Sequence, residues 1–420
     1  MTHKSPSSLP VRRIAGFILG LSALAASAGA VAASPDARRV HDAAVVLDTH
    51  FDTPANFSRP GWSILNRHDW RLDDSQVDLP RMIEGGVDGG FFVVFTPQGP
   101  LGPEGNAAAR DHAVFRTSEI REMVARHGDQ FELALTADDA ERILARKKRF
   151  VFMSMENGAP VAGDLSLLKT FYDLGVRMVG PVHFRNNDLS DSSTDTRLWG
   201  GLSPLGQSFV AQANRLGMVI DASHASDEAL DQMIALSEAP IILSHSGCKD
   251  VFDHPRNVDD ERLKALAAKG GVIQINAFSA YMITTPRIPE REAALAELAR
   301  SLGISGRNMT AAQRRAFAEG RQSIDARWPL PRANMDDLMA HMLHALELVG
   351  PDHVGISGDF DGGGGIEGLE DVTGFPEITR RLLAAGYGQA DINKIWGGNA
   401  LRVLKAAEAV RDRLNSGKAD

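Results

Sequence analysis

Two histidines, His224 and His245, each stand where a short apolar segment of the sequence stops. The segments that precede them, residues 217–223 and 239–244, are separated by a polar helical stretch, and this pattern is typical of a buried βαβ unit. Parallel strands end at the same edge of a sheet, so both imidazoles should emerge together. Two imidazoles at one edge can bind a metal ion or a substrate, although two hydrogen-bonded core histidines would show the same pattern.

A second half of a metal site can be read from His50, Asp52 and Glu156. His50 and Asp52 are two positions apart, so in an extended segment their side chains lie on one face. A nitrogen and an oxygen ligand suit zinc or a similar divalent ion, although a hydrogen-bonded turn would also explain this pair. The two carboxylate oxygens of Glu156 could bridge this ion to a second one at the histidine pair.

Three further side chains could act on a substrate. Asp359 could take a proton from a metal-bound water and deliver it to a leaving amine, or it could simply cap the following loop. His183 could stabilise the oxyanion of a tetrahedral intermediate. Arg256 suits bidentate binding of a substrate carboxylate, and a solvated surface arginine is the alternative.

The scaffold that would bring these side chains together is an alternation of strands and helices that begins near residue 40. Eight strands, each followed by a helix, predict an α/β fold of the (β/α)8 TIM type, with its active site at the carboxyl ends of the strands. The expected strands cover residues 43–47, 89–95, 150–156, 175–183, 217–224, 239–245, 271–276 and 353–359. An insertion at residues 280–332 separates strands seven and eight, and a helical tail covers residues 378–414.

The first 33 residues have the pattern of a secretory signal peptide. Lys4, Arg12 and Arg13 precede an apolar run, and Ala30-Val31-Ala32 offers a small-residue cleavage site. An uncleaved anchor helix is the alternative, and the sequence leaves Sec and twin-arginine export open. Residues 34–420 should then form a single metallohydrolase domain in the periplasm or outside the cell, without a stable membrane anchor.

Charge and cysteine content narrow the possible partners. The signal segment carries three positive charges, so its removal moves the formal net charge from −9 to −12. An acidic exported protein is a poor candidate for binding nucleic acid or anionic membranes. The single cysteine, Cys248, excludes an intrachain disulfide, so stability must come from a large core and from bound metal.

Seven stretches of the sequence resemble the membrane (renal) dipeptidases, peptidase family M19, within the amidohydrolase-like metal-dependent barrels. They span nearly the whole mature chain and cover residues 48–54, 201–206, 214–224, 244–246, 254–258, 358–362 and 397–403. The resemblance implies two zinc ions per chain. The ligands it implies are His50, Asp52 and bridging Glu156 for one ion, and Glu156, His224 and His245 for the other.

The same resemblance implies roles for three residues around a dipeptide substrate. His183 would lie at the scissile carbonyl, Arg256 would bind the terminal carboxylate, and Asp359 would be the proton shuttle near the free amine. The sequence departs from the family pattern at residues 157–160 and 184–187, and its insertion at 280–332 is longer than in the mammalian members. These departures concern the side-chain preference more than the chemistry.

The expected function is that of an exported zinc-dependent dipeptidase in which a metal-bound hydroxide attacks the peptide carbonyl. The same binuclear site acting on another amide or on a lactone is one alternative, and a non-catalytic periplasmic binding protein is another. A homodimer is compatible with the sequence, which does not specify the oligomeric state.

Overall fold

The computed structural model describes residues 35–304 and 309–417, which belong to the compact unit Ala33–Asp420. The expected signal peptide, residues 1–33, lies outside these described residues. Within them, no helix combines the length and the hydropathy that crossing a bilayer requires.

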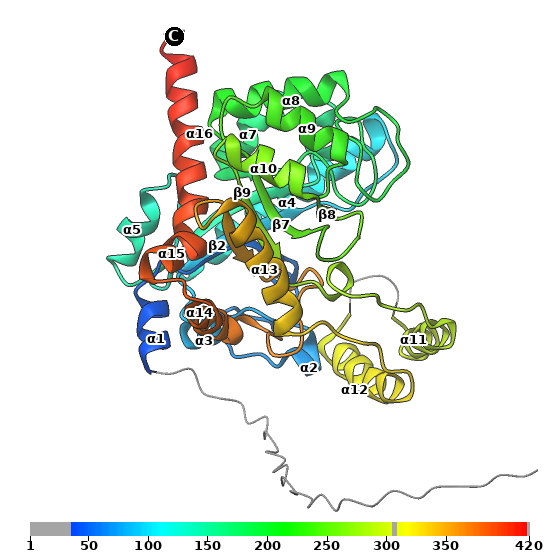
Figure 1. Cartoon of the computed structure of the whole chain (residues 1–420). Coiled ribbons are helices and arrows are strands. Elements are labelled where there is room, and N and C mark those ends of the chain that lie inside the picture. The colour runs from blue at the N-terminus through cyan, green and yellow to red at the C-terminus, as the bar shows by residue number, and fades with distance from the viewer. Residues whose placement is uncertain (1–34, 305–308, 418–420) are drawn as a thin grey trace, which may run out of the picture. The chain divides into compact units, whose positions relative to one another are not determined.

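Parallel strands form the centre of this unit, in two sheets (Figure 1). The first sheet runs in the order β1 (Leu47–Phe51), β2 (Gly89–Phe95), β4 (Arg149–Glu156), β5 (Val176–Val179) and β6 (Val219–Ile220). The second contains β10 (Val354–Ser357), β9 (Val272–Asn276) and β7 (Ile242–Cys248). Two short strands that the sequence did not predict pair at the side, β3 (Phe131–Leu133) with β4 and β8 (Asn257–Val258) with β7.

Two isolated bridges join the sheets into a closed barrel. Asp221 pairs with Ile242 at one seam, and Phe51 pairs with Phe360 at the other. At the second seam the buried carboxylate of Asp48 on β1 also accepts hydrogen bonds from Ser357 Oγ at 2.9 Å and from Gly358 N at 2.8 Å. The barrel contains eight strands in chain order, and the predicted (β/α)8 fold is confirmed.

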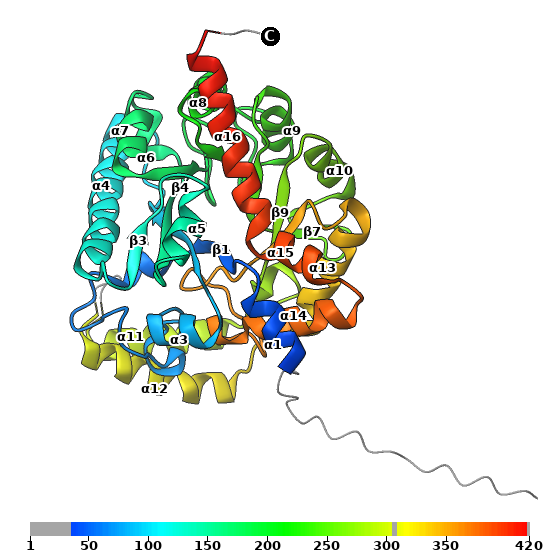
Figure 2. The same ribbon diagram turned by 90° about the vertical axis from the view of Figure 1, so that its left-hand side faces the viewer.

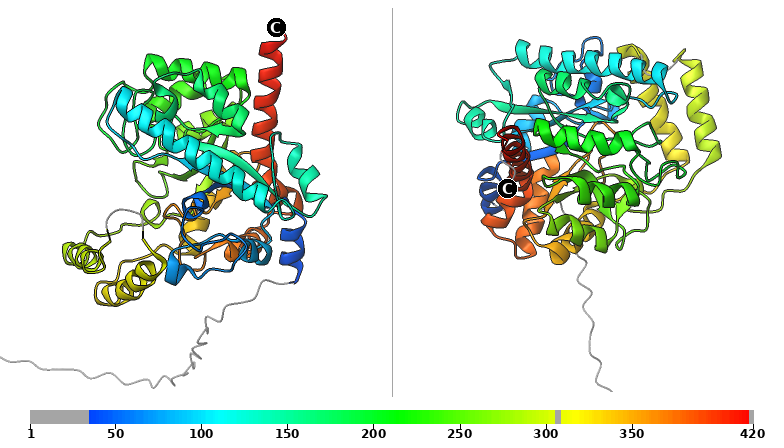
Figure 3. Two further views of the ribbon diagram at one scale, coloured as in Figure 1. Left: turned by 180° about the vertical axis from the view of Figure 1, so that it is seen from behind. Right: turned by 90° about the horizontal axis from the view of Figure 1, so that it is seen from above.

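Helices surround the strands (Figures 2 and 3). The longer helices of the barrel are α4 (Pro103–Arg126), α7 (Leu167–Leu174), α8 (Pro204–Leu216), α9 (Asp227–Leu236), α10 (Asp260–Ala268), α13 (Met335–Val349), α14 (Phe375–Ala384) and α16 (Asn399–Asn415). Shorter helical pieces include α1 (Pro35–Asp42), η1 (Thr53–Asn56), α2 (Trp70–Asp73), α3 (Leu79–Glu84), α5 (Asp139–Leu144), α6 (Ala159–Ala162), η2 (Ser279–Tyr281), η3 (Val372–Gly374), α15 (Gln389–Asn393) and η4 (Lys394–Gly398).

The C-terminal helix α16 belongs to the hydrophobic cluster at the amino ends of the strands. Val403 and Leu404 of this helix are fully buried in one cluster with Leu47, Val219 and Val272, which lie at or near the start of β1, β6 and β9. This packing fills the amino end of the barrel with apolar side chains. The polar side chains His50, Glu156 and His245 lie at the opposite, carboxyl end.

The insertion between β9 and β10 carries α11 (Pro289–Ser301) and α12 (Ala311–Arg327). The two helices lie side by side at the end of the unit opposite α16 (Figures 1 and 2). Arg291 of α11 pairs with Asp325 of α12 at 2.7 Å, and Arg321 of α12 pairs with Asp74, which follows α2, at 2.7 Å. These ion pairs place α12 beside the carboxyl end of the barrel.

The structure corrects the bounds of four expected strands, and the fourth of the eight ends at Val179 rather than at His183. The first begins at Leu47 rather than residue 43, and the sixth continues past His245 to Cys248. The fifth ends at Ile220, before His224, because the Asp221 carboxylate accepts the amides of Ser223 and Ser244 at 3.0 and 2.9 Å and turns the chain out of the ladder.

Candidate active site

The carboxyl ends of the strands open into a pocket of about 810 Å³. Every side chain that the sequence assigned to metal binding, to oxyanion stabilisation or to proton transfer lines it. These residues are His50, Asp52, Glu156, His183, His224, His245 and Asp359. They come from six different strand ends, so only the closed barrel brings them together.

Glu156, the last residue of β4, lies at the centre of this group. Its Oε1 is 3.0 Å from His224 Nε2 and 3.4 Å from His245 Nε2, while its Oε2 is 3.6 Å from His50 Nε2. The two oxygens therefore face different histidines. A carboxylate in this position can serve two ions at once.

His50 and Asp52 form the other half of the group. His50 Nε2 is 3.3 Å from Asp52 Oδ2, and these two residues with Asp359 have potential ligand atoms that all lie within 4.8 Å of one another. The potential ligand atoms of His50, Glu156 and His245 also all lie within 4.8 Å of one another. Asp359 is thus close enough to His50 and Asp52 to be a third ligand of the same ion.

A buried hydrogen-bond chain orients His245. Ser244 Oγ donates to Asp221 Oδ2 at 2.6 Å and lies 2.8 Å from His245 Nδ1. A hydroxyl has one proton to donate, and because Ser244 donates it to Asp221, Ser244 Oγ must accept a hydrogen bond from the protonated Nδ1 of His245. Nε2 of His245 therefore carries a lone pair, and it points at Glu156 and His224.

His224 and Asp359 are held in left-handed backbone conformations. Their φ angles are +69° and +51°, and Asn157 and Asp361 near the same pocket have φ angles of +70° and +67°. Such values are uncommon outside glycine and cluster at functional sites, where the surrounding structure compensates the strain. At His224 the turn directs Nε2 to a point 2.9 Å from His245 Nε2.

Burial controls the protonation of the group. Burial lowers the pKa of His224 and of His245 well below 6.5, so both imidazoles are neutral. Burial opposes protonation of His50 too, but the carboxylates of Glu156 and Asp52 outweigh it and raise its pKa to about 10. Burial also raises the pKa of Glu156 to about 8. The site therefore concentrates acidic groups that require a positive counter-charge.

These donors fit a divalent metal. Neutral imidazole nitrogens and carboxylate oxygens are the ligands that zinc prefers in catalytic sites. The carboxyl groups of Glu156, Asp359 and the partly exposed Asp52 also lie within one pocket, where a cation would offset their mutual repulsion. The imidazole and carboxylate groups of the pocket are thus numerous enough to bind two adjacent ions that share Glu156.

His183 lies on the loop after β5, with 15% of its side chain exposed. Its Nε2 is 4.0 Å from Glu156 Oε1, and its ring is 4.3 Å from the ring of His224 and 4.0 Å from that of Phe184. Its potential ligand atom also groups with those of Glu156 and His224. The position suits either a third ligand or a hydrogen-bond donor beside the metals.

Asp359 follows β10 and is 7% exposed. Burial raises the pKa of its carboxyl to about 6, and Asn276 Nδ2 at the end of β9 donates to its Oδ2 at 3.0 Å. A carboxyl group that titrates close to neutral pH is suited to exchanging protons with a substrate.

Arg256 lies behind the pocket wall rather than in it. It is 3% exposed, donates to the His245 carbonyl at 3.1 Å, and has its guanidinium 5.3 Å from the ring centre of Tyr281, which does line the pocket. Arg256 Nε has no hydrogen-bond partner among the described residues. A buried guanidinium with an unused donor is a strong candidate for binding an anion.

Sequence reasoning missed three residues of this site. Asp221 and Ser244 orient His245, and Tyr281 separates Arg256 from the pocket. Asp221 and Ser244 lie three and one positions before the histidines, so their polar side chains inside apolar segments were a usable signal. Tyr281 carried no such signal, because only the fold brings η2 to Arg256.

The sequence of the chain matches the family described as "Membrane dipeptidase (Peptidase family M19)" over residues 35–418. It is 30% identical over 359 residues to Dipeptidase tcpJ of Claviceps purpurea, covering 82% of this chain and 74% of that protein. It is 27% identical over 344 residues to Dipeptidase 3 of Rattus norvegicus, covering 80% and 60%.

Two solved structures resemble the fold closely. The probable dipeptidase PvdM from Pseudomonas aeruginosa has a TM-score of 0.75 and 31% identity, covering 89% of this chain and 98% of that one. A metallo peptidase from Rhodobacter sphaeroides, liganded with a phosphinate mimic of the dipeptide L-Ala-D-Ala, has a TM-score of 0.67 and 26% identity, covering 86% and 99%.

The barrel and its group of buried histidines and carboxylates therefore define a metal-dependent hydrolase. The chain belongs to peptidase family M19, and it is a metal-dependent dipeptidase.

Proposed function

We propose that this enzyme is an exported dipeptidase that uses two zinc ions per chain. The observation that carries the proposal is the position of Glu156, whose two oxygens face different histidines. His50 and Asp52 would bind one ion, His224 and His245 would bind the other, and Glu156 would bridge them. When bound, the ions would lower the pKa of a water molecule and polarise the peptide carbonyl.

The proton transfers fall to Asp359. Its carboxylate would accept the proton of the attacking water and return it to the departing amine nitrogen. Asn276, which donates to Asp359 Oδ2 at 3.0 Å, would keep the other oxygen turned toward the reacting atoms. His183, on the side of Glu156 away from His50, would donate a hydrogen bond to the carbonyl oxygen as negative charge develops there.

The carboxyl terminus of the dipeptide would be bound by Arg256. The buried guanidinium already faces the ring of Tyr281 and has an unused Nε donor, and a substrate carboxylate that approaches past this ring would form a charge-assisted pair. The phosphinate dipeptide mimic bound by the Rhodobacter sphaeroides relative supports a dipeptide as the substrate.

Export remains part of the proposal. The sequence of residues 1–33 predicts a signal peptide that would deliver residues 34–420 to the periplasm or the outside as one domain. A homodimer stays a prediction.

The test combines metal analysis with a substrate panel. The purified enzyme loaded with zinc should hydrolyse members of a panel of L-Xaa-L-Xaa and L-Xaa-D-Xaa dipeptides, and Arg256→Ala should raise KM strongly across the panel. Arg215→Ala, an exposed arginine of α8 outside the pocket lining, is the control and should leave KM unchanged. If the zinc-loaded protein cleaved none of these dipeptides, the proposed function would be wrong.

A further inference from the structure

The pocket extends well beyond the residues that would bind metal. Its far end is lined by the loop after η1, by α4 and by the first turn of α12, which contribute Ser58, Arg59, Pro60, Phe115, Arg116, Met309, Thr310 and Arg314. The volume of about 810 Å³ lies toward the upper end of the roughly 300–1,000 Å³ that is usual for small-molecule sites. A dipeptide with small side chains at the metal end would leave this far end unfilled.

Two arginines at the far end have no carboxylate of their own. Arg59 and Arg314 are both half-buried, and among the described residues no carboxylate oxygen lies within 4.0 Å of either guanidinium. Arg116 in the same wall differs, because its guanidinium pairs with Glu119 at 2.7 Å. The nearby Asp73 and Asp74 are already paired, with His68 at 2.8 Å and with Arg321 at 2.7 Å.

The positive charge of Arg314 also acts on Arg59. Burial lowers the pKa of Arg59, and the positive charge of Arg314 lowers it further. Burial likewise lowers the pKa of Arg314, and the carboxylates of Asp73 and Asp74 act in the opposite direction on both arginines. Like charges that share a partly buried wall repel each other, and these two carboxylates offset the repulsion only from more than 4.0 Å away. A negatively charged group on the substrate would relieve this repulsion.

Hydrogen bonds within the protein fix the position of the Arg59 guanidinium. It donates through Nη1 to Asn56 Oδ1 and to Ser75 Oγ at 3.1 Å, and through Nη2 to the Asp73 carbonyl at 2.6 Å. These bonds fix the plane of the guanidinium before any ligand arrives, so little conformational entropy is lost on binding. Arg314 comes from the insertion, and its Nη2 donates to the Met309 carbonyl at 3.3 Å.

We propose that Arg59 and Arg314 form a subsite for a carboxylate carried by a side chain of the dipeptide, so that the enzyme favours substrates containing glutamate or aspartate. The inference rests on the proposed hydrolysis at the metal end and adds a substrate class to it. This subsite is separate from Arg256, which would bind the terminal carboxylate of every dipeptide. Guanidinium–carboxylate pairs have the geometry and strength for such selection.

The test compares acidic substrates with their neutral isosteres. The values of kcat/KM are measured for L-Glu-L-Ala against L-Gln-L-Ala, and for L-Ala-L-Glu against L-Ala-L-Gln, which distinguishes a carboxylate on the first residue from one on the second. One acidic dipeptide should exceed its isostere by at least about tenfold, as expected for a charge-assisted hydrogen bond. Arg314→Gln should bring this ratio close to one, and Arg59→Gln should lower it as well.

The matched control is Arg315→Gln, an exposed arginine next to Arg314 that lies outside the pocket lining, and it should preserve the ratio. Thermal unfolding verifies that each variant is folded, and Arg314→Gln alone suffices if Arg59→Gln disturbs its loop. The subsite proposal would be wrong if each acidic dipeptide and its neutral isostere had equal kcat/KM, or if Arg314→Gln did not change their ratio. Either result would leave the dipeptidase proposal intact. Hydrolysis of none of the four substrates by the zinc-loaded enzyme would overturn both.

Discussion

At the scale of single residues, the chemistry depends on which nitrogen of each histidine is free. The hydrogen bonds from Asp221 through Ser244 to His245 determine this for one proposed ligand, because Ser244 Oγ accepts from Nδ1–H and so favours the tautomer in which Nε2 is unprotonated. Metal-binding histidines commonly need such a partner to fix their orientation. Asp221 also turns the chain toward His224, so one carboxylate positions both histidines of the pair.

Ser244→Ala should weaken zinc binding without removing a ligand. Loss of the hydroxyl leaves His245 Nδ1 and Asp221 Oδ2 without this contact, and outer-sphere changes of this kind typically lower metal affinity about 10- to 100-fold. Competition with a chromophoric chelator measures this affinity directly. Ser208→Ala, an exposed serine of α8, is the control and should bind zinc like the wild type. Unchanged zinc affinity in Ser244→Ala would contradict the proposed role of the chain.

The acidic limb of the pH profile should report Asp359. Burial raises the pKa of this carboxyl to about 6, and only its ionised form can accept a proton from water. Activity should therefore be retained at neutral pH and fall as the pH drops below about 6. Bound cations favour the ionised carboxylate, so in the metal-loaded enzyme the fall should occur at a lower pH. Asp359→Asn should lose about 10²- to 10⁴-fold in kcat. A profile of kcat/KM that stays level from neutral pH to well below this region would argue against Asp359.

The site residues were largely predictable, and the contacts that support them were not. Histidines and carboxylates at the ends of apolar segments identify candidates such as Glu156 and His245 because buried strands seldom end in ionisable groups. Arg256 was predicted at the substrate, but its position behind Tyr281 depends on packing between η2 and the loop after β7. The subsite pair of Arg59 and Arg314 is separated by 255 positions, so only the folded chain brings the two together.

At the scale of elements, the number and order of the strands were predicted better than their bounds. The alternation of apolar and amphipathic segments identified the eight strands of the barrel in their order along the chain. The fifth strand was expected to reach His224 but ends at Ile220, because the hydrogen bonds of Asp221 compete with the ladder. Local side-chain competition of this kind is invisible to hydrophobic periodicity.

The helix α16 should make a large contribution to the stability of the barrel. Leu404 is fully buried in the cluster at the amino ends of the strands, and Leu404→Ala should lower the free energy of unfolding by about 2–5 kcal/mol through lost burial and a cavity. Urea denaturation of the enzyme measures the change. Leu236→Ala on α9, where the leucine is 46% exposed, should change the free energy of unfolding by less than about 0.5 kcal/mol. Equal effects of the two substitutions would show that α16 does not seal the barrel.

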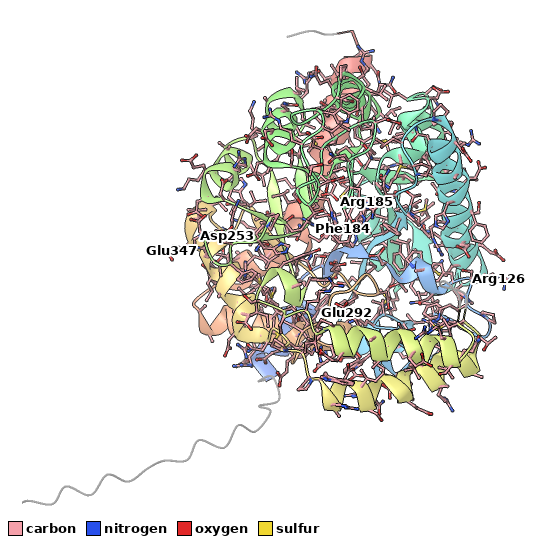
Figure 4. All side chains as sticks on the ribbon, turned by 90° about the vertical axis from the view of Figure 1, so that its right-hand side faces the viewer. Arg126, Phe184, Arg185, Asp253, Glu292 and Glu347 are labelled. Atoms are coloured by element: carbon pink, nitrogen blue, oxygen red, sulfur yellow. The ribbon has the colours of Figure 1, made fainter. Side chains whose placement is uncertain are left out.

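At the scale of the whole molecule, the two ends of the barrel have opposite characters. Apolar side chains and α16 fill the amino end, and the carboxyl end concentrates buried acids and imidazoles under the insertion that carries α11 and α12. Figure 4 shows this face, where Phe184 and Arg185 of the loop after β5 lie above α11 and its Glu292. Phe184 and, from the insertion, Met309, Thr310 and Arg314 line the pocket, whereas residues 157–160 do not, so only part of the departures from the family pattern faces the space for a substrate.

The measurement that tests the central claim most directly is a zinc titration of the metal-free enzyme, followed simultaneously by metal content and by hydrolysis of a dipeptide. If Glu156 bridges two ions, activity should reach its maximum only when about two zinc ions per chain are bound, and chelation should abolish it. Glu156→Gln should bind less zinc and lose activity, since a neutral amide cannot bridge two cations. Full dipeptidase activity with one ion per chain, or with none, would contradict the account.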